Sequence, residues 1–185
     1  MMIDDDGWLT GVRHHPSPNY DGRPDNCPVE LIVIHNISLP PEQFDGDWIL
    51  DFFCNELDPQ AHPYFSKIAN LQVSSHLLIR RDGEVIQFVS FNQRAWHAGQ
   101  SCYQGKERCN DFSIGIELEG SDNQSFTEQQ YQALQQITEL LISHYPELNE
   151  ERIAGHSDIA PDRKTDPGPC FDWQHYKNLL HSTRA

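Results

Sequence analysis

One short apolar run limits the folds open to this chain more than any other feature. Residues 31–34 read Leu-Ile-Val-Ile, without a polar interruption and with three β-branched side chains. Such a run is typical of a strand that is buried on both faces. A strand of this kind belongs in a sheet that is covered by helices, so the run favours the α/β class.

Two further regions have the patterns of strands. Residues 75–80 and 85–89 flank the sequence Arg-Asp-Gly-Glu. An Asp-Gly pair between alternating apolar segments is a strong signal of an antiparallel hairpin. Residues 112–119 alternate between apolar and polar positions, which predicts a strand with two distinct faces. The apolar face carries Ile114, Ile116 and Leu118, and the polar face carries Ser113, Gly115, Glu117 and Glu119.

Three helices are expected. Residues 127–130 match a capping box and are followed by apolar residues at helical spacing until Tyr145 and Pro146. A second helix begins near Asp172 and runs almost to the C-terminus, and a third lies around residues 48–56. Strands early and in the middle of the chain, with helices between them, predict a mixed α/β fold: a central mixed β-sheet flanked by helices.

Length and charge narrow the class of protein. A chain of 185 residues can close one hydrophobic core, and no shift in composition suggests a second. Residues 1–185 are therefore expected to form a single domain, with the Pro-rich residues 1–28 as an arm packed on it. The formal net charge is -15. This charge repels phosphate backbones and anionic headgroups, so neither nucleic acid nor a membrane surface is expected as a partner.

The N-terminal sequence and the cysteine pattern both predict a cytoplasmic protein. The first six residues have neither a positive n-region nor an apolar h-region, and no later stretch is long enough for a bilayer span. Five cysteines form an odd set without Cys-x-x-Cys spacing. They predict free thiols rather than a disulfide framework or a thiolate zinc site. We expect a cytoplasmic protein, and no oligomer is implied.

Residues able to form a hydrolytic metal site lie in three separate segments, around His35, around Glu117 and in the polar loop that follows His156. His35 is expected at the end of the first strand, where loops and sites gather. Two neutral imidazoles, one carboxylate and an open fourth position suit a catalytic zinc ion, because the open position can hold the attacking water. The loop offers three rival carboxylates, Asp158, Asp162 and Asp166. Strand periodicity likewise treats Glu117 and Glu119 alike.

Longer motifs accompany these residues, at 7–10, 35–41, 58–65, 94–99, 110–120 and 155–173. In them the chain resembles the zinc-dependent N-acetylmuramoyl-L-alanine amidases, and most of all their cytoplasmic AmpD type. The resemblance covers nearly the whole chain. It implies the architecture that these amidases share with peptidoglycan-recognition proteins.

The resemblance also implies a role for individual residues. His35, His156 and Asp166 would bind one Zn²⁺ per chain. Glu117 would be the catalytic acid–base residue, and Lys164 would stabilise the oxyanion of the tetrahedral intermediate. The implied substrate contacts are Asn36, Trp96, Arg108 and Asn110. Trp96 could stack on a sugar face, with a buried core position as the rival interpretation, and Arg108 could bind a carboxylate of the stem peptide.

The remaining histidines, His62, His76 and His97, are interpreted as structural. The leading hypothesis is hydrolysis of the amide bond between N-acetylmuramic acid and L-alanine, with soluble anhydro-muropeptides from cell-wall turnover as the substrate. The alternatives are a non-catalytic module that binds peptidoglycan fragments, and a zinc amidase that acts on intact wall. Residues 39–65, with several prolines and little periodicity, are predicted to be a mobile cover over the site.

Overall fold

The computed structural model describes residues 1–44 and 46–182. Asp45, within the predicted cover, and residues 183–185, within the predicted domain, lie outside the described residues. The centre of the fold is a six-stranded sheet in the order β1-β5-β4-β9-β3-β10. These strands are β1 (Arg13–His14), β3 (Leu31–Ile37), β4 (Leu77–Ile79), β5 (Val85–Gln87), β9 (Ser113–Glu119) and β10 (Ile153–Gly155). Only β4 and β5 pair antiparallel among these neighbours, so the sheet is mixed, as predicted.

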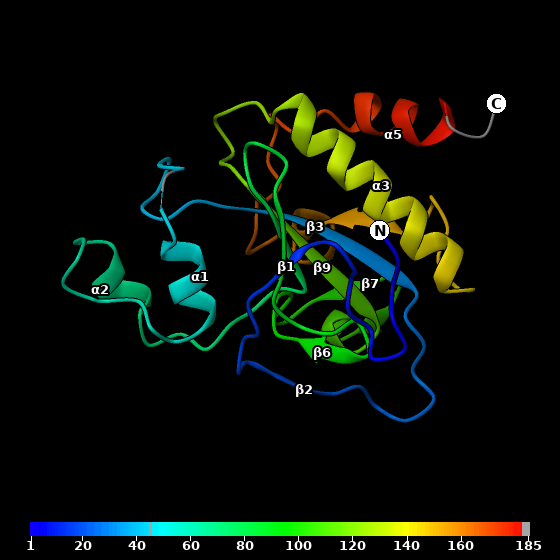
Figure 1. The fold of residues 1–185 in the computed structure, drawn as a ribbon, viewed down its shortest axis with the longest axis horizontal. Helices are drawn as coiled ribbons and strands as arrows, with labels where there is room; N and C mark the ends of the chain where they lie inside the picture. The colour runs from blue at the N-terminus through cyan, green and yellow to red at the C-terminus, as the bar shows by residue number, and fades with distance from the viewer. Residues whose placement is uncertain (45, 183–185) are drawn as a thin grey trace.

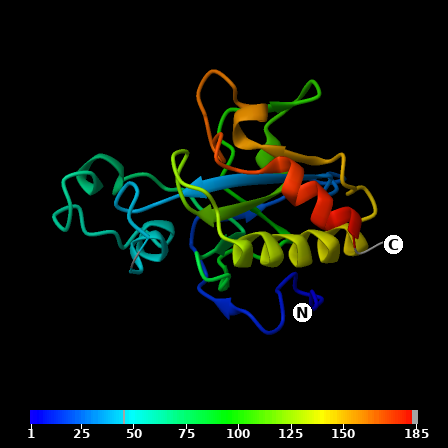
Figure 2. The same ribbon diagram turned by 90° about the horizontal axis from the view of Figure 1, so that it is seen from above.

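Helices lie on both sides of this sheet. The long helix α3 (Glu128–His144) and the C-terminal helix α5 (Trp173–Ser182) cover one face (Figure 1). Figure 2 shows α3 on one side of β3 and β9, and the short helix α4 (His156–Ile159) on the other. In both views α1 (Trp48–Phe53) and α2 (Phe65–Ile68) stand apart at the left. The helix expected around residues 48–56 is therefore confirmed but ends earlier.

Shorter elements complete the chain. The described residues also form two small antiparallel pairs, β2 (Tyr20–Gly22) with β6 (Gln93–Ala95) and β7 (Cys102–Tyr103) with β8 (Lys106–Glu107). A 3-10 helix, η1 (Cys109–Asp111), leads into β9. The predicted capping box is present at the start of α3, where Thr127 accepts a hydrogen bond from the Gln130 backbone N–H. These residues satisfy donors that the first helical turn leaves unpaired.

The sheet is buried on both faces. Ile32 and Ile34 of β3 pack with Ile116 of β9 against α3, whereas Leu31 and Val33 point into a separate cluster on the opposite face. Strand β3 is thus buried on both sides, as its sequence predicts. The alternation along β9 also holds, but its polar face is covered rather than open to solvent. Polar side chains enclosed in this way need specific partners.

The N-terminal residues 1–28 join this sheet. Strand β1 pairs with β5, and the buried Leu9 backbone N–H donates to Gln87 Oε1 at 2.7 Å. Arg23 reaches further into the protein. Its guanidinium donates to the backbone carbonyls of Asp111 and Ser113, at 3.1 and 2.9 Å. Burial lowers the pKa of Arg23 to about 10. The arm therefore supports the segment that leads into β9.

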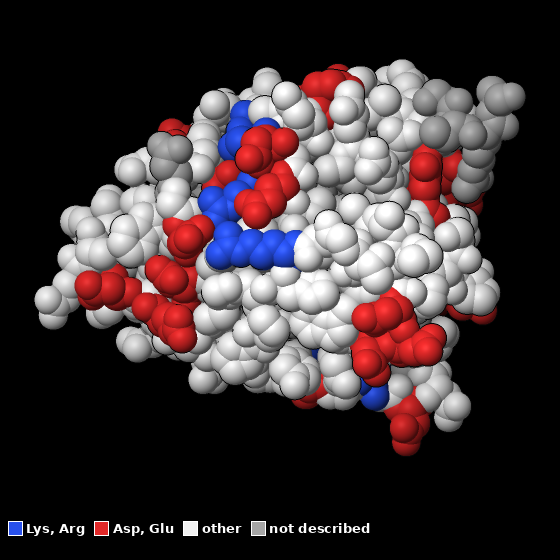
Figure 3. All heavy atoms as spheres, viewed as in Figure 1, with Lys and Arg blue, Asp and Glu red and all other residues white. Residues whose placement is uncertain are grey.

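The distribution of charged side chains and the free state of the cysteines agree with what the composition predicts. On the face in Figure 3, acidic side chains form several separate groups, and the few Lys and Arg side chains lie beside them rather than in a continuous basic patch. All five cysteines are free, as predicted. Within residues 1–44 and 46–182, no helix is long and apolar enough to cross a membrane.

Candidate metal centre

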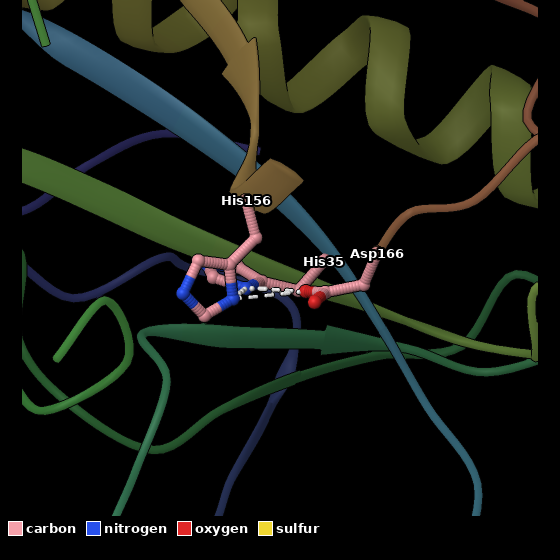
Figure 4. Close-up of side chains that lie close together, drawn as sticks. All are labelled: His35, His156 and Asp166. Atoms are coloured by element: carbon pink, nitrogen blue, oxygen red, sulfur yellow. Dashed lines mark hydrogen bonds and ion pairs between the residues drawn. The ribbon is translucent and has the colours of Figure 1, made fainter. Parts of the chain in front are cut away.

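Three side chains from separate elements converge at one point (Figure 4). His35 lies on β3, His156 is the first residue of α4, and Asp166 lies in the loop between α4 and α5. The two Nδ1 atoms are 2.9 Å apart, and each is 3.0 Å from Asp166 Oδ2. Both histidines are buried, and the Asp166 side chain is 14 % exposed. Three ligand atoms this close together could hold one metal ion.

Strand register explains how the two histidines meet. Strands β3 and β10 run parallel, with Gly155 paired to Ile34, so the next residue of each chain segment emerges at the same level. The chain turns into α4 directly after Gly155, whose N–H donates to Asp158 Oδ2 at 2.7 Å. His35 is two residues inside the end of β3 rather than at its last position.

Close packing brings in the third residue. A Cβ atom on Gly155 would lie 2.8 Å from Pro167, so only glycine lets the loop approach this closely. The Ser157 N–H also donates to the Asp166 carbonyl at 2.9 Å. Of the rival carboxylates, Asp158 caps α4 and Asp162 is exposed, while Asp166 faces the histidines.

The outer nitrogens of both histidines also have partners. His156 Nε2 is 3.1 Å from the Ala98 carbonyl, and His35 Nε2 is 2.9 Å from His97 Nδ1. The sequence predicts a structural role for His97, and no local pattern in it predicts this contact. The signal that could have found it is Gly115, because a Cβ there would lie 2.5 Å from the His97 ring.

Glu117 lies beside the triad. It pairs with His35 in the register of β9 and β3, so both side chains leave the sheet on the same face. Its Oε2 is buried and has no hydrogen-bond partner among the described residues. Glu119, which periodicity could not separate from Glu117, accepts a hydrogen bond from the Arg81 N–H at 3.1 Å instead. This unpartnered oxygen distinguishes Glu117 from Glu119.

Burial and hydrogen bonds shift the pKa values of three groups in the site. Burial lowers the pKa of His35 to about 4, which keeps this imidazole neutral. Burial raises the pKa of Glu117 well above its usual value, the Asp166 carboxylate raises it further, and Lys164 lowers it. For Asp166, burial raises the pKa, but the contacts with His156 and His35 outweigh it and leave the pKa below the usual range. The site therefore places the neutral imidazole of His35 beside an ionised carboxylate.

A cavity of about 380 Å³ opens onto these residues. Asn36, Trp96 and Lys164 line it together with the triad and Glu117. Most of the other lining residues are apolar, and several belong to the segment predicted as a cover. Those within the predicted cover are Leu39, Pro41, Phe52, Phe53 and Tyr64, and Ile68, Leu71 and Val73 follow it in the chain. The cover therefore faces the site, and its mobility stays a prediction. Tyr64 is a polar wall residue that sequence analysis missed.

The four predicted substrate contacts fall in different places. The Asn36 amide donates to Asp122 Oδ1 at 2.8 Å while lining the cavity. Trp96 is half-buried in the same wall. Asn110 instead accepts hydrogen bonds from the backbone N–H groups of residues 97 and 98, at 3.1 and 2.7 Å. Arg108 lines a different cavity, of about 370 Å³. Substrate contact at these positions stays a prediction.

Comparison with known proteins agrees with this site. A sequence model of the family described as N-acetylmuramoyl-L-alanine amidase matches residues 25–169. The 1,6-anhydro-N-acetylmuramyl-L-alanine amidase AmpD of Escherichia coli is 58 % identical, and the match covers 97 % of both chains. A crystal structure of a selenomethionine AmpD derivative superposes with a TM-score of 0.94 at 57 % identity, covering 97 % of this chain and 99 % of that one.

A more distant structure was determined with its substrate. The Escherichia coli amidase AmiD, in complex with anhydro-N-acetylmuramic acid-L-Ala-D-γ-Glu-L-Lys, superposes with a TM-score of 0.62 at 29 % identity. That match covers 85 % of this chain and 60 % of the AmiD chain. The fold and the site define an amidase of the peptidoglycan-processing class. The chain belongs to the N-acetylmuramoyl-L-alanine amidase family.

Proposed function

We propose that this protein is a zinc-dependent hydrolase that cleaves the amide bond between N-acetylmuramic acid and L-alanine, with 1,6-anhydro-muropeptides of cell-wall recycling as its substrates. The observation that carries the proposal is the His35, His156 and Asp166 triad beside the unpartnered buried oxygen of Glu117. The name of the AmpD relative and the muropeptide bound to AmiD support the choice of substrate. We further propose that the reaction takes place in the cytoplasm.

The chemistry of the donor set fits zinc. Two imidazole nitrogens and one carboxylate oxygen are typical ligands of catalytic Zn²⁺, with bonds of roughly 2.0–2.2 Å. The three atoms lie 2.9 to 3.0 Å from one another. At this spacing the repulsion between their lone pairs is relieved either by a hydrogen on one nitrogen or by a cation between the three atoms. His35, His156 and Asp166 would hold one ion and leave a further coordination position for water or substrate.

The surrounding residues would complete the reaction. When bound, zinc supplies Lewis acidity, which polarises the scissile carbonyl and acidifies water. Glu117 would accept a proton from the attacking water and pass it to the leaving nitrogen, and its raised pKa suits both steps. Lys164 would donate a hydrogen bond to the oxyanion, which is worth on the order of 3 kcal/mol in other hydrolases.

The cavity walls suggest how the substrate is held. We propose that Asn36 and Trp96 contact the muropeptide directly, with the Trp96 ring against the sugar. Arg108 would bind an acidic group of the stem peptide from the other cavity, which it lines. Its cation also offsets the negative field that the net charge produces. Asn110 holds the backbone of residues 97 and 98, and we propose that it also contacts the substrate, as its motif implies.

Metal analysis and an amidase assay on the wild-type protein test this proposal. About one zinc ion per chain with release of peptide from an anhydro-muropeptide is the expected result. A zinc-free protein that binds the muropeptide without cleaving it would identify a recognition module instead. Faster cleavage of polymeric sacculi than of the anhydro-muropeptide would point to intact wall as the substrate. Cell fractionation tests the cytoplasmic location.

A further inference from the structure

Behind the candidate metal centre, hydrogen bonds link both metal-facing histidines to backbone carbonyls. His156 reaches the Ala98 carbonyl directly, at 3.1 Å. His35 reaches the Cys109 carbonyl through two intermediates, His97 and Ser113. We propose that His97 is a positioning residue, which fixes the tautomer of His35 so that its Nδ1 lone pair faces the metal. This inference rests on the proposed metal site.

The direction of each hydrogen bond between His35 and the Cys109 carbonyl can be derived by starting at the carbonyl. Ser113 Oγ and the Cys109 carbonyl oxygen are 2.6 Å apart, and two oxygens at this distance need a hydrogen between them. A carbonyl has none, so the Ser113 hydroxyl donates. Its single hydrogen is then used. Ser113 can only accept from His97 Nε2, which lies 3.1 Å away.

The next hydrogen bond, toward the candidate metal centre, has its direction fixed in the same way. A neutral imidazole carries one hydrogen, so with Nε2 of His97 protonated its Nδ1 is an acceptor. This Nδ1 is 2.9 Å from His35 Nε2, which must therefore donate. His35 then has no hydrogen on Nδ1, the atom that faces His156 and Asp166. The ligand tautomer is thus fixed by the backbone before any metal arrives.

Independent contacts keep His97 in this place. Its ring packs so closely on Gly115 that a Cβ atom on residue 115 would lie 2.5 to 2.8 Å from three ring atoms. Its backbone N–H donates to Asn110 Oδ1 at 3.1 Å. Arg23 holds the carbonyl of Ser113, at 2.9 Å. Three residues of one sequence motif therefore help to hold the His97 ring in place: Asn110, Ser113 and Gly115.

Two measurements on the chelator-treated and zinc-titrated protein test the proposal. Imidazole ¹⁵N NMR of the metal-free protein reports which nitrogen of His35 carries the hydrogen. Zinc affinity is measured by competition with a chromophoric chelator. In the wild type we expect the Nε2–H tautomer of His35. His97→Leu, which keeps an apolar bulk but no acceptor, is expected to populate the Nδ1–H tautomer and to weaken zinc binding roughly 10- to 100-fold.

Milder variants separate positioning from folding. His97→Asn keeps an acceptor near the position of Nδ1 and is expected to recover most of the zinc affinity. Ser113→Ala removes the hydroxyl that directs the relay, and should shift the His35 tautomer with a smaller loss of affinity. Ser143→Ala is the matched control, because its hydroxyl also donates to a backbone carbonyl, 2.7 Å away on the exposed surface of α3.

The outcomes distinguish this inference from the proposed function. Wild-type zinc binding together with unchanged tautomer and affinity in both His97→Leu and Ser113→Ala would overturn the positioning role and leave the amidase intact. Wild-type protein that takes up no zinc would overturn the metal site itself. A His35 that is mainly Nδ1–H in the metal-free wild type would also refute the derived direction of the relay.

Discussion

The candidate site has two halves that are built in different ways. His35 and Glu117 stand on adjacent parallel strands, paired in register and buried between layers. Asp166 and Lys164 belong to an irregular loop that follows α4, and they are partly exposed. The strand half is held by the sheet ladder, whereas the loop half depends on a few contacts such as that of Gly155 with Pro167. The rigid strands thus position His35 and Glu117, whose protonation states matter for the site. The loop adds the charged side chains of Asp166 and Lys164.

The largest expected effect separates Asp166 from the other carboxylates of its loop. Asp166→Ala removes the only carboxylate among the three converging residues, and leaves two histidines. We expect loss of nearly all bound zinc and all measurable amidase activity. Elemental analysis and muropeptide cleavage give the answer. Asp162→Ala is the control, because this exposed aspartate lies in the same loop. Equal zinc loss in both variants would mean that the loop acts as a whole.

A second variant tests the strand half. Glu117→Gln keeps the shape of the side chain but removes its capacity to take up a proton. We expect zinc content to stay near that of the wild type and the rate of cleavage to fall roughly 10²- to 10⁴-fold. Glu119→Gln serves for comparison, since this residue lies on the same face of β9 and its carboxylate binds the Arg81 N–H. Comparable losses in both variants would remove the distinction between the two glutamates.

The third variant returns to the loop. Lys164→Met removes the cation that lines the cavity beside the triad. The turnover number is expected to fall roughly 10²- to 10³-fold, with zinc content unchanged, because one oxyanion donor is lost. Steady-state kinetics separate this from weaker substrate binding, which would raise KM alone. Lys67→Met, on α2, controls for the loss of a positive charge. An unchanged turnover number would assign Lys164 to the surface.

The strand half could largely be predicted from the sequence. The apolar run at residues 31–34 and the alternation along residues 113–119 are local patterns, and they determine which side chains share a face. The order of the sheet does not follow from them. Strand β10 pairs with β3 across more than a hundred residues of sequence, and no local pattern marks Ile153–Gly155 as its neighbour.

The loop half could not be predicted from local patterns at all. Asp158, Asp162 and Asp166 are equivalent in sequence, and only the resemblance to the amidases selected one of them. The choice depends on tertiary contacts, the cap of α4 by Asp158 and the approach of Pro167 to Gly155. His97 shows the same limit. Its contact with the site is a hydrogen bond with His35, which lies 62 positions away in the sequence.

The smallest expected effect compares the two halves by pH, in protein stripped of metal. Burial lowers the pKa of His35 from 6.5 to about 4. Between these values the unfolded chain binds more protons than the folded one, so stability is present above pH 6.5 and is lost as the pH falls toward 4. The pKa of Asp166 is also lowered, from 3.8, so its contribution is lost only at still lower pH.

Urea denaturation with a chelator at pH 7.5 and pH 5.0 measures this difference. The loss per histidine is at most about 1.4 kcal/mol for each pH unit. His76 and His97, whose pKa values burial lowers well below 6.5, add to the wild-type slope. His35→Gln should therefore reduce the slope without abolishing it, whereas Asp166→Asn should leave it in place. A wild-type stability that is equal at the two pH values would show that the strand half is not held by neutral histidines.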